Sequence, residues 1–177
     1  MVTGEELVSK TKKTFDNPLV EMKSLYEECK REQTTLMERE KKVMFHANRI
    51  KVTVEDFEKA AKNLTAPINL RNFKEKYQII KETKGKMTEL ISDIRNNIVT
   101  NITNKIEKVG KLIDENEDKV PTNIEDFKKE VEMVFQEVES AKIFIETATT
   151  FMTDEIDFKI APYKPKIREM GLDKLEY

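Results

Sequence analysis

The chain has 177 residues, the size of a single domain, and charged residues make up 37% of it, more than a compact globular protein usually carries. Lysine and arginine number 32 against 34 aspartates and glutamates. The net charge of −2 disfavours a general nucleic-acid binder, which needs a basic surface, but it leaves room for a local basic patch. One cysteine excludes an internal disulfide and favours a reducing compartment.

Residues 1–15 are expected to form a leader with a weak amphipathic pattern. Lys10, Lys12 and Lys13 flank its few apolar residues, whereas Glu5 and Glu6 oppose contact with anionic lipid. We therefore expect a frayed terminus here more than a helix that orders on a membrane.

A first long helix is predicted from Pro18 to about residue 64. Proline suits a first helical turn, and Asp16 or Asn17 is placed to cap it. Every seventh residue is apolar, which predicts helices packed along a shared seam. The residues of this helix-packing seam are Met22, Cys29, Leu36, Val43, Ile50, Phe57 and Leu64. A parallel row contains Gln33 and Glu40, so we expect the middle of the seam to be less tightly buried.

Two further long helices follow a break at Pro67. The second runs to about Glu117, and the third runs from Ile124 to Ile156 after an acidic turn at residues 114–121. The expected fold is therefore all-α, with three long, kinked, antiparallel helices in a coiled-coil bundle over residues 16–161. Residues 162–177 would be a tail with room for a short helix. Because a rod three helices thick leaves apolar surface uncovered, we expect a homodimer.

No catalytic, cofactor or metal site is predicted, so the chain is not expected to be an enzyme. His46 is the one histidine and has no second ligand at metal spacing. Cys29 belongs to the apolar seam, where a thiol acts as a small hydrophobic side chain. The four glycines stand too far apart for a phosphate-binding loop.

Residues 10–64 contain, in order, a basic run, an aromatic–acidic pair, two residues ten apart and a charged run before a valine. These are Lys10–Lys13, Phe15-Asp16, Tyr26, Leu36, Glu38–Lys42 and Val43. Residues 98–119 add an Ile/Val-rich stretch that leads into a charged turn, and residues 131–156 add a third apolar-patterned helix. Over residues 10–160 the chain resembles a divergent, short BAR (Bin/amphiphysin/Rvs) domain.

The resemblance implies a crescent-shaped homodimer that binds, senses or shapes curved anionic membranes with its concave face and tips. Each lysine near the surface would contribute about 1 kcal/mol. The lysines expected to contact membrane are Lys105, Lys108, Lys111, Lys119, Lys128, Lys129, Lys10, Lys12 and Lys13. The turn at residues 114–118 is acidic, where membrane-binding members are often basic. The implied location is cytoplasmic and peripheral on membranes, since no apolar run approaches the roughly 18 residues of a membrane span.

Other functions stay open. A structural coiled-coil or adaptor protein would bind other coiled-coil proteins without lipid affinity. A helical carrier of small apolar ligands would need a cavity that a seam of Ile and Val does not obviously leave. For any single lysine, the ordinary interpretation is a solvated helix face paired with acids such as Glu107 and Glu125.

Overall fold

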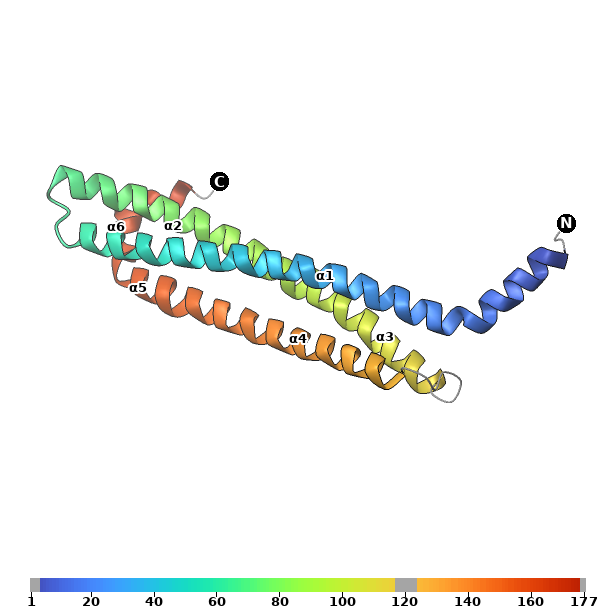
Figure 1. Cartoon of the computed structure of the whole chain (residues 1–177). Coiled ribbons are helices and arrows are strands. Elements are labelled where there is room, and N and C mark those ends of the chain that lie inside the picture. Colours follow the sequence, from blue (N-terminus) through green and yellow to red (C-terminus); the bar gives the residue numbers. More distant parts are fainter. Residues whose placement is uncertain (1–3, 117–123, 176–177) are drawn as a thin grey trace. The chain divides into compact units, whose positions relative to one another are not determined.

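The protein, seen in a computed structural model, is all-α, and three long helices pack as a bundle (Figure 1). The structure describes residues 4–116 and 124–175, and the side chains within 19–116 and 124–173. In chain order the elements are α1 (Gly4–Ala61), α2 (Pro67–Asp93), the π-helix η1 (Ile94–Val99), α3 (Thr100–Asn116), α4 (Ile124–Phe151), the π-helix η2 (Met152–Asp157), α5 (Phe158–Ile160), the 3-10 helix η3 (Ala161–Tyr163), α6 (Lys164–Glu169) and the 3-10 helix η4 (Leu172–Leu175). The prediction of an all-α bundle of three long helices is confirmed.

Helix α1 begins at Gly4, well before Pro18, where the sequence predicted its start. A proline inside a helix removes one backbone hydrogen bond and crowds the preceding turn, which bends the helix without necessarily ending it. The blue N-terminal part of α1 is bent (Figure 1). The backbone of the predicted leader is therefore helical from Gly4 onward, while the side chains of Lys10, Lys12 and Lys13 lie outside the described part.

By their internal contacts the residues form two compact units, each containing segments of the three long helices. Unit 1 is Met1–Met37 with Asn96–Lys142, and unit 2 is Glu38–Arg95 with Ile143–Tyr177. In unit 2 the turn after Ala61 reverses the chain, so α1 and α2 run antiparallel there (Figure 1). Lys119 and most of the predicted acidic turn fall in residues 117–123, outside the described residues.

The core of unit 1 forms where α1 packs against α3 and α4. The ring of Tyr26 on α1 meets Phe127 on α4 edge to face, with centroids 5.4 Å apart. Gln33, expected to soften the seam, is buried, and its Nε2 donates a hydrogen bond to the Glu137 carboxylate. The buried apolar residues of this unit include Met22, Cys29, Leu36, Ile102, Ile106, Val109, Ile113, Ile124, Val131, Val134 and Val138. A polar pair at the seam therefore joins α1 to α4 instead of loosening them.

The core of unit 2 contains a cluster of aromatic rings. Phe57 on α1 stacks on Phe73 of α2 with ring centroids 4.5 Å apart. Tyr163 stands edge-on to Phe57 at 5.4 Å, and Tyr77 lies at 6.1 Å. Aromatic pairs in such geometries add about 0.5–1.5 kcal/mol each beyond the burial of their area. The cluster is therefore expected to be a main source of stability in this unit.

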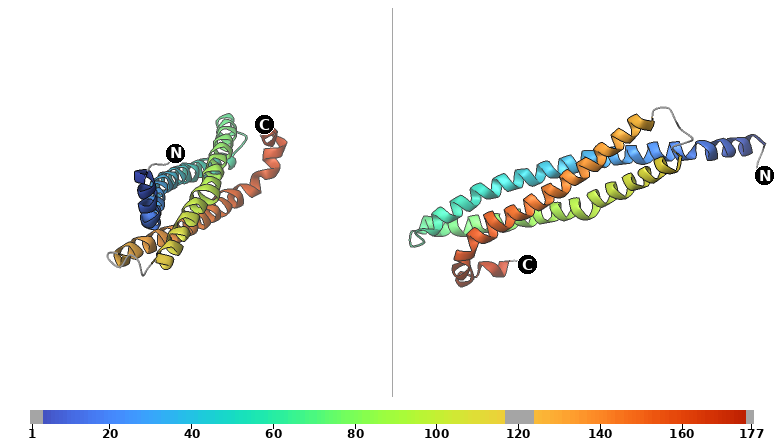
Figure 2. Two further views of the ribbon diagram at one scale, coloured as in Figure 1. Left: turned by 90° about the vertical axis from the view of Figure 1, so that its right-hand side faces the viewer. Right: turned by 90° about the horizontal axis from the view of Figure 1, so that it is seen from below.

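The residues after Pro162, predicted to be a tail, pack on unit 2. The chain turns sharply after α5 and comes back beside α2 (Figure 2). The Tyr77 hydroxyl donates to the Asp173 carboxylate at 2.8 Å, and Ile167 and Leu172 are buried. Gly171 has φ 70°, a left-handed conformation that favours glycine, and it ends the short helix α6. The short C-terminal segment thus covers part of the core.

The predicted seam on α1 is covered by the chain itself. Met22, Cys29, Leu36, Val43, Ile50 and Phe57 are each at most 5% exposed. Leu64 is half-buried and follows the end of α1 at Ala61. Because helices of the same chain already cover this row, it does not remain available for a second copy, and a homodimer needs another apolar surface.

Candidate functional site

The lysines of α3 that were predicted to contact membrane differ in their surroundings. Lys105 Nζ lies 2.9 Å from Glu32 Oε1 and 3.5 Å from Glu28 Oε2, and the hydrogen bond that Lys105 donates to Glu32 raises the Lys105 pKa. Lys108 Nζ lies 3.2 Å from Glu21 Oε1. Lys111 is exposed and makes no ion pair with a described residue. Acidic side chains of α1 therefore form ion pairs with Lys105 and Lys108, whereas Lys111 faces solvent.

The lysines at the start of α4 are similarly divided. Lys128 Nζ lies 3.6 Å from Glu125 Oε1, one turn earlier on the helix, and the Lys128 side chain is only 29% exposed. Lys129 is exposed. Of the nine predicted lysines, Lys111 and Lys129 are thus the two whose described side chains best suit contact with an anionic surface. None of the described helices has an apolar stretch long enough to cross a bilayer.

Cys29 is a buried thiol in the core of unit 1. It is 0% exposed, and its Sγ lies 3.8 Å from the backbone oxygen of Ile102. Burial, with the nearby Glu32 carboxylate, raises the Cys29 pKa to about 11. A protonated, enclosed thiol is a poor nucleophile, so the expected role of Cys29 in packing fits its surroundings.

Alkylation of Cys29 by iodoacetamide at about pH 8 is expected to be at least about 100-fold slower in the folded protein than in the urea-unfolded chain. The rise in pKa from 9.0 to about 11 lowers the thiolate fraction by that factor before any steric protection is counted. Since the chain has one cysteine, mass spectrometry can follow the fraction of chains that carry one label over time, and this gives the rate. Equal rates in both states would contradict the described burial.

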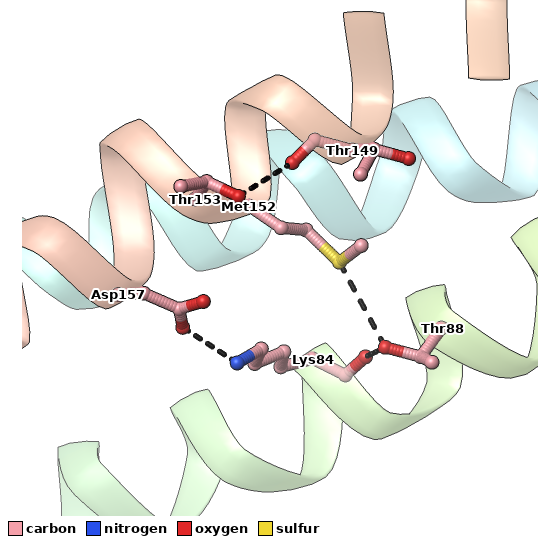
Figure 3. Close-up of polar contacts among 6 residues, drawn as sticks. All are labelled: Lys84, Thr88, Thr149, Met152, Thr153 and Asp157. Carbon is pink, nitrogen blue, oxygen red and sulfur yellow. Dashed lines mark hydrogen bonds and ion pairs between the residues drawn. The ribbon is translucent and has the colours of Figure 1, made fainter. Parts of the chain in front are cut away.

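A groove of about 480 Å³ lies in unit 2 between α2 and the segment from η2 to α6. Ion pairing and hydrogen bonding cross it. Lys84 Nζ lies 2.5 Å from Asp157 Oδ1 (Figure 3). The Thr88 hydroxyl donates to the Lys84 backbone oxygen at 2.8 Å, and its oxygen lies 3.8 Å from the Met152 sulfur (Figure 3). The residues that line the groove are Tyr77, Ile80, Lys81, Lys84, Gly85, Thr88, Ile156, Asp157, Ile160 and Lys164. Four of its ten lining residues are charged, and the Lys84–Asp157 ion pair joins its two sides.

Three large apolar side chains of α1 lie exposed on unit 2. Met44 is 51% exposed, Phe45 is 65% exposed and Val52 is 59% exposed. Phe45 and Val52 are seven residues apart, so they lie on one side of the helix, with Asn48 between them. We refer to Met44, Phe45, Asn48 and Val52 as the α1 stripe. The spacing of seven was visible in the sequence, but an apolar row through Phe45 and Val52 was not predicted.

Within the described residues, no three His, Cys, Asp or Glu side chains come together in a way that could hold a metal ion. Comparisons of the chain with protein-family models, with curated protein sequences and with solved structures found no match.

Proposed function

We propose that the chain is a non-catalytic BAR-like module: a homodimer whose surface binds curved anionic membranes. Long helices packed side by side, an exposed apolar row on α1 and two solvent-facing lysines support this function. The BAR-like resemblance of residues 10–160 suggests how they combine, in a crescent that meets the membrane with its concave face and tips.

The observation that carries the proposal is the α1 stripe. Phe45 and Val52 each expose more than half of their surface, although a monomeric soluble protein gains by covering such side chains. Fully burying a Phe, Val or Met side chain stabilises by about 1.5–3 kcal/mol. A two-fold interface repeats the same patch on both copies, so the stripe would count twice. Asn48 in the middle would favour one register, as a polar residue in a coiled-coil seam does.

The membrane half of the proposal depends on exposed cations of unit 1. Lys111 and Lys129 face solvent, and a dimer would present two of each. At about 1 kcal/mol for each lysine near an anionic surface, four lysines suffice for weak, salt-sensitive binding. Lys105 and Lys108 would add little, because Glu32 and Glu21 already neutralise them.

Replacing both Lys111 and Lys129 with glutamine is expected to weaken binding to phosphatidylserine vesicles by roughly tenfold or more at low salt. Vesicle co-sedimentation measures the bound fraction. Lys23→Gln is the matched control, because Lys23 is an exposed lysine of unit 1 outside the predicted set, and we expect a much smaller effect from it. Absence of wild-type binding at low salt would overturn the membrane half.

An adaptor protein without lipid affinity is the second candidate function. The ion pairs that occupy Lys105 and Lys108 favour it, since they reduce the positive charge open to lipid. The α1 stripe would then bind an apolar helix face of another coiled-coil protein. Such binding would change little with salt, whereas the membrane mode weakens as salt rises.

A further inference from the structure

A hollow of about 460 Å³ lies beside His46, the one histidine of the chain. It belongs to unit 2, and side chains of α1 and α2 line it. They are Arg39, Lys42, His46, Lys86, Glu89, Leu90 and Asp93. We refer to this site as the basic hollow, for the charges described next.

Three cations lie near the His46 ring. Lys42 precedes it by four residues on α1 and Arg49 follows it by three, so both lie on its side of the helix. Lys86 approaches from α2. None of the three makes an ion pair with a described residue, and all three act electrostatically on the ring.

The acids that line the hollow offset only part of this charge. Asp93 Oδ2 lies 3.3 Å from Arg39 Nε, so these two largely cancel. Glu89 has no ion pair with a described residue and is the other carboxylate in the lining. Lys42 and Lys86 line the hollow, and Arg49 lies outside the lining but acts on the His46 ring. Three cations without an ion pair to a described residue therefore outnumber the one such carboxylate.

The surroundings of the His46 ring disfavour its protonated, positively charged form. His46 Nδ1 is buried and has no hydrogen-bond partner among the described residues. Burial, followed by Lys86, Arg49 and Lys42, lowers the His46 pKa. The lowered pKa favours the neutral ring near pH 7, with three cations close to it and Glu89 as the one lining carboxylate that has no ion pair with a described residue. A bound anion would relieve this repulsion.

We propose that the basic hollow binds a phosphate monoester group, carried either by a lipid headgroup or by a small soluble molecule. A phosphate monoester has a charge of about −1.5 to −2 near pH 7 and three acceptor oxygens, which suits a site with more cations than carboxylates. A carboxylate, with a single charge, would offset less of this excess positive charge than a phosphate monoester. The lipid case rests on the proposed membrane function, while the soluble case does not need it.

The His46 ring signals in NMR spectra test the site directly, because no other histidine overlaps them. Soluble inositol trisphosphate and, separately, inorganic phosphate are added to the full-length chain. We expect saturable shifts of the His46 signals and a titration midpoint at higher pH in the bound state. The midpoint rises because the anion offsets the positive charge of Lys86, Arg49 and Lys42, which lowers the His46 pKa in the free protein. The other charged residues of the lining are Glu89 and the paired Asp93 and Arg39, and the anion adds to the negative charge of the two carboxylates. Shifts that never saturate would overturn the proposal.

Charge variants separate a specific site from general attraction. Lys42→Gln and Lys86→Gln are each expected to weaken inositol trisphosphate binding roughly fivefold. Glu89→Gln should tighten it by a similar factor, because it removes the opposing carboxylate. Lys74→Gln, an exposed lysine elsewhere on α2, is the matched control and should change nothing. Lys42 and Lys86 are exposed, so folding should be unaffected, and equal effects from all three lysine variants would overturn the site.

Vesicles decide the source of the phosphate. Phosphatidylinositol bisphosphate vesicles that bind the wild type more tightly than phosphatidylserine vesicles, and lose this preference with Lys86→Gln, support a lipid headgroup. Binding of soluble inositol trisphosphate without such a preference supports a soluble ligand. Vesicle binding that ignores Lys86→Gln, together with unmoved His46 signals, overturns the basic hollow and leaves the proposed membrane function standing.

Discussion

Replacing Phe57 with alanine is expected to lower the free energy of unfolding by about 3–5 kcal/mol. Phe57 is 0% exposed and touches the rings of Phe73, Tyr77 and Tyr163, so its removal leaves a cavity lined by three aromatic side chains. Those rings come from α2 and from the segment after α5, and the cavity would therefore loosen all parts of unit 2 that meet there. Urea unfolding followed by circular dichroism measures the loss.

Phe158→Ala is the control for this prediction. Phe158 is 77% exposed, so the same substitution removes little buried area and should change the free energy of unfolding by less than about 0.5 kcal/mol. If both variants lost the same stability, the aromatic cluster would not be the core of unit 2.

The double variant Phe45→Ser, Val52→Ser is expected to weaken self-association by about 100-fold or more. In a two-fold interface it removes four apolar side chains at once, and every 1.4 kcal/mol corresponds to a factor of ten in the dissociation constant. Size-exclusion chromatography with light scattering, over a range of concentrations, measures the shift from dimer to monomer. The free energy of unfolding of the monomer should hardly change, because both side chains are more than half exposed.

Phe158→Ser provides the matched control. Phe158 lies in α5 and is more exposed than Phe45, at 77% against 65%. We expect this variant to associate like the wild type. Dissociation of both variants to the same degree would mean that exposed apolar area in general, and not the α1 stripe, drives the association.

The long helices could be read from the sequence because their apolar residues repeat at three, four and seven. The same rule placed Val43, Ile50 and Phe57 in one row, and all three are buried. It could not place the start of α1, because a proline favours a first helical turn, whereas α1 runs through Pro18 from Gly4. Nor could it foresee that the residues after Pro162 would pack on the aromatic cluster, since their few apolar residues show no helical repeat.

The roles of individual charges were beyond the sequence. Lys105, Lys108 and Lys111 have the same spacing, but only the packing of α3 against α1 determines that Glu32 and Glu21 lie opposite the first two. The basic hollow has the same origin, because Lys86 is forty residues from His46 in the chain. The α1 stripe was within reach, since Phe45 and Val52 keep the heptad interval. The row through Phe45 and Val52 can be recognised as exposed only once the structure shows that the row through Val43, Ile50 and Phe57 is the buried one.

Sedimentation equilibrium of the wild-type protein tests the central claim most directly, namely that a surface of this chain works by binding a second copy. We expect a molecular mass of about twice the 20.8 kDa of one chain at micromolar concentrations, falling to that of one chain in Phe45→Ser, Val52→Ser. A wild-type mass of one chain at every concentration would contradict the homodimer, and with it the BAR-like function built on it.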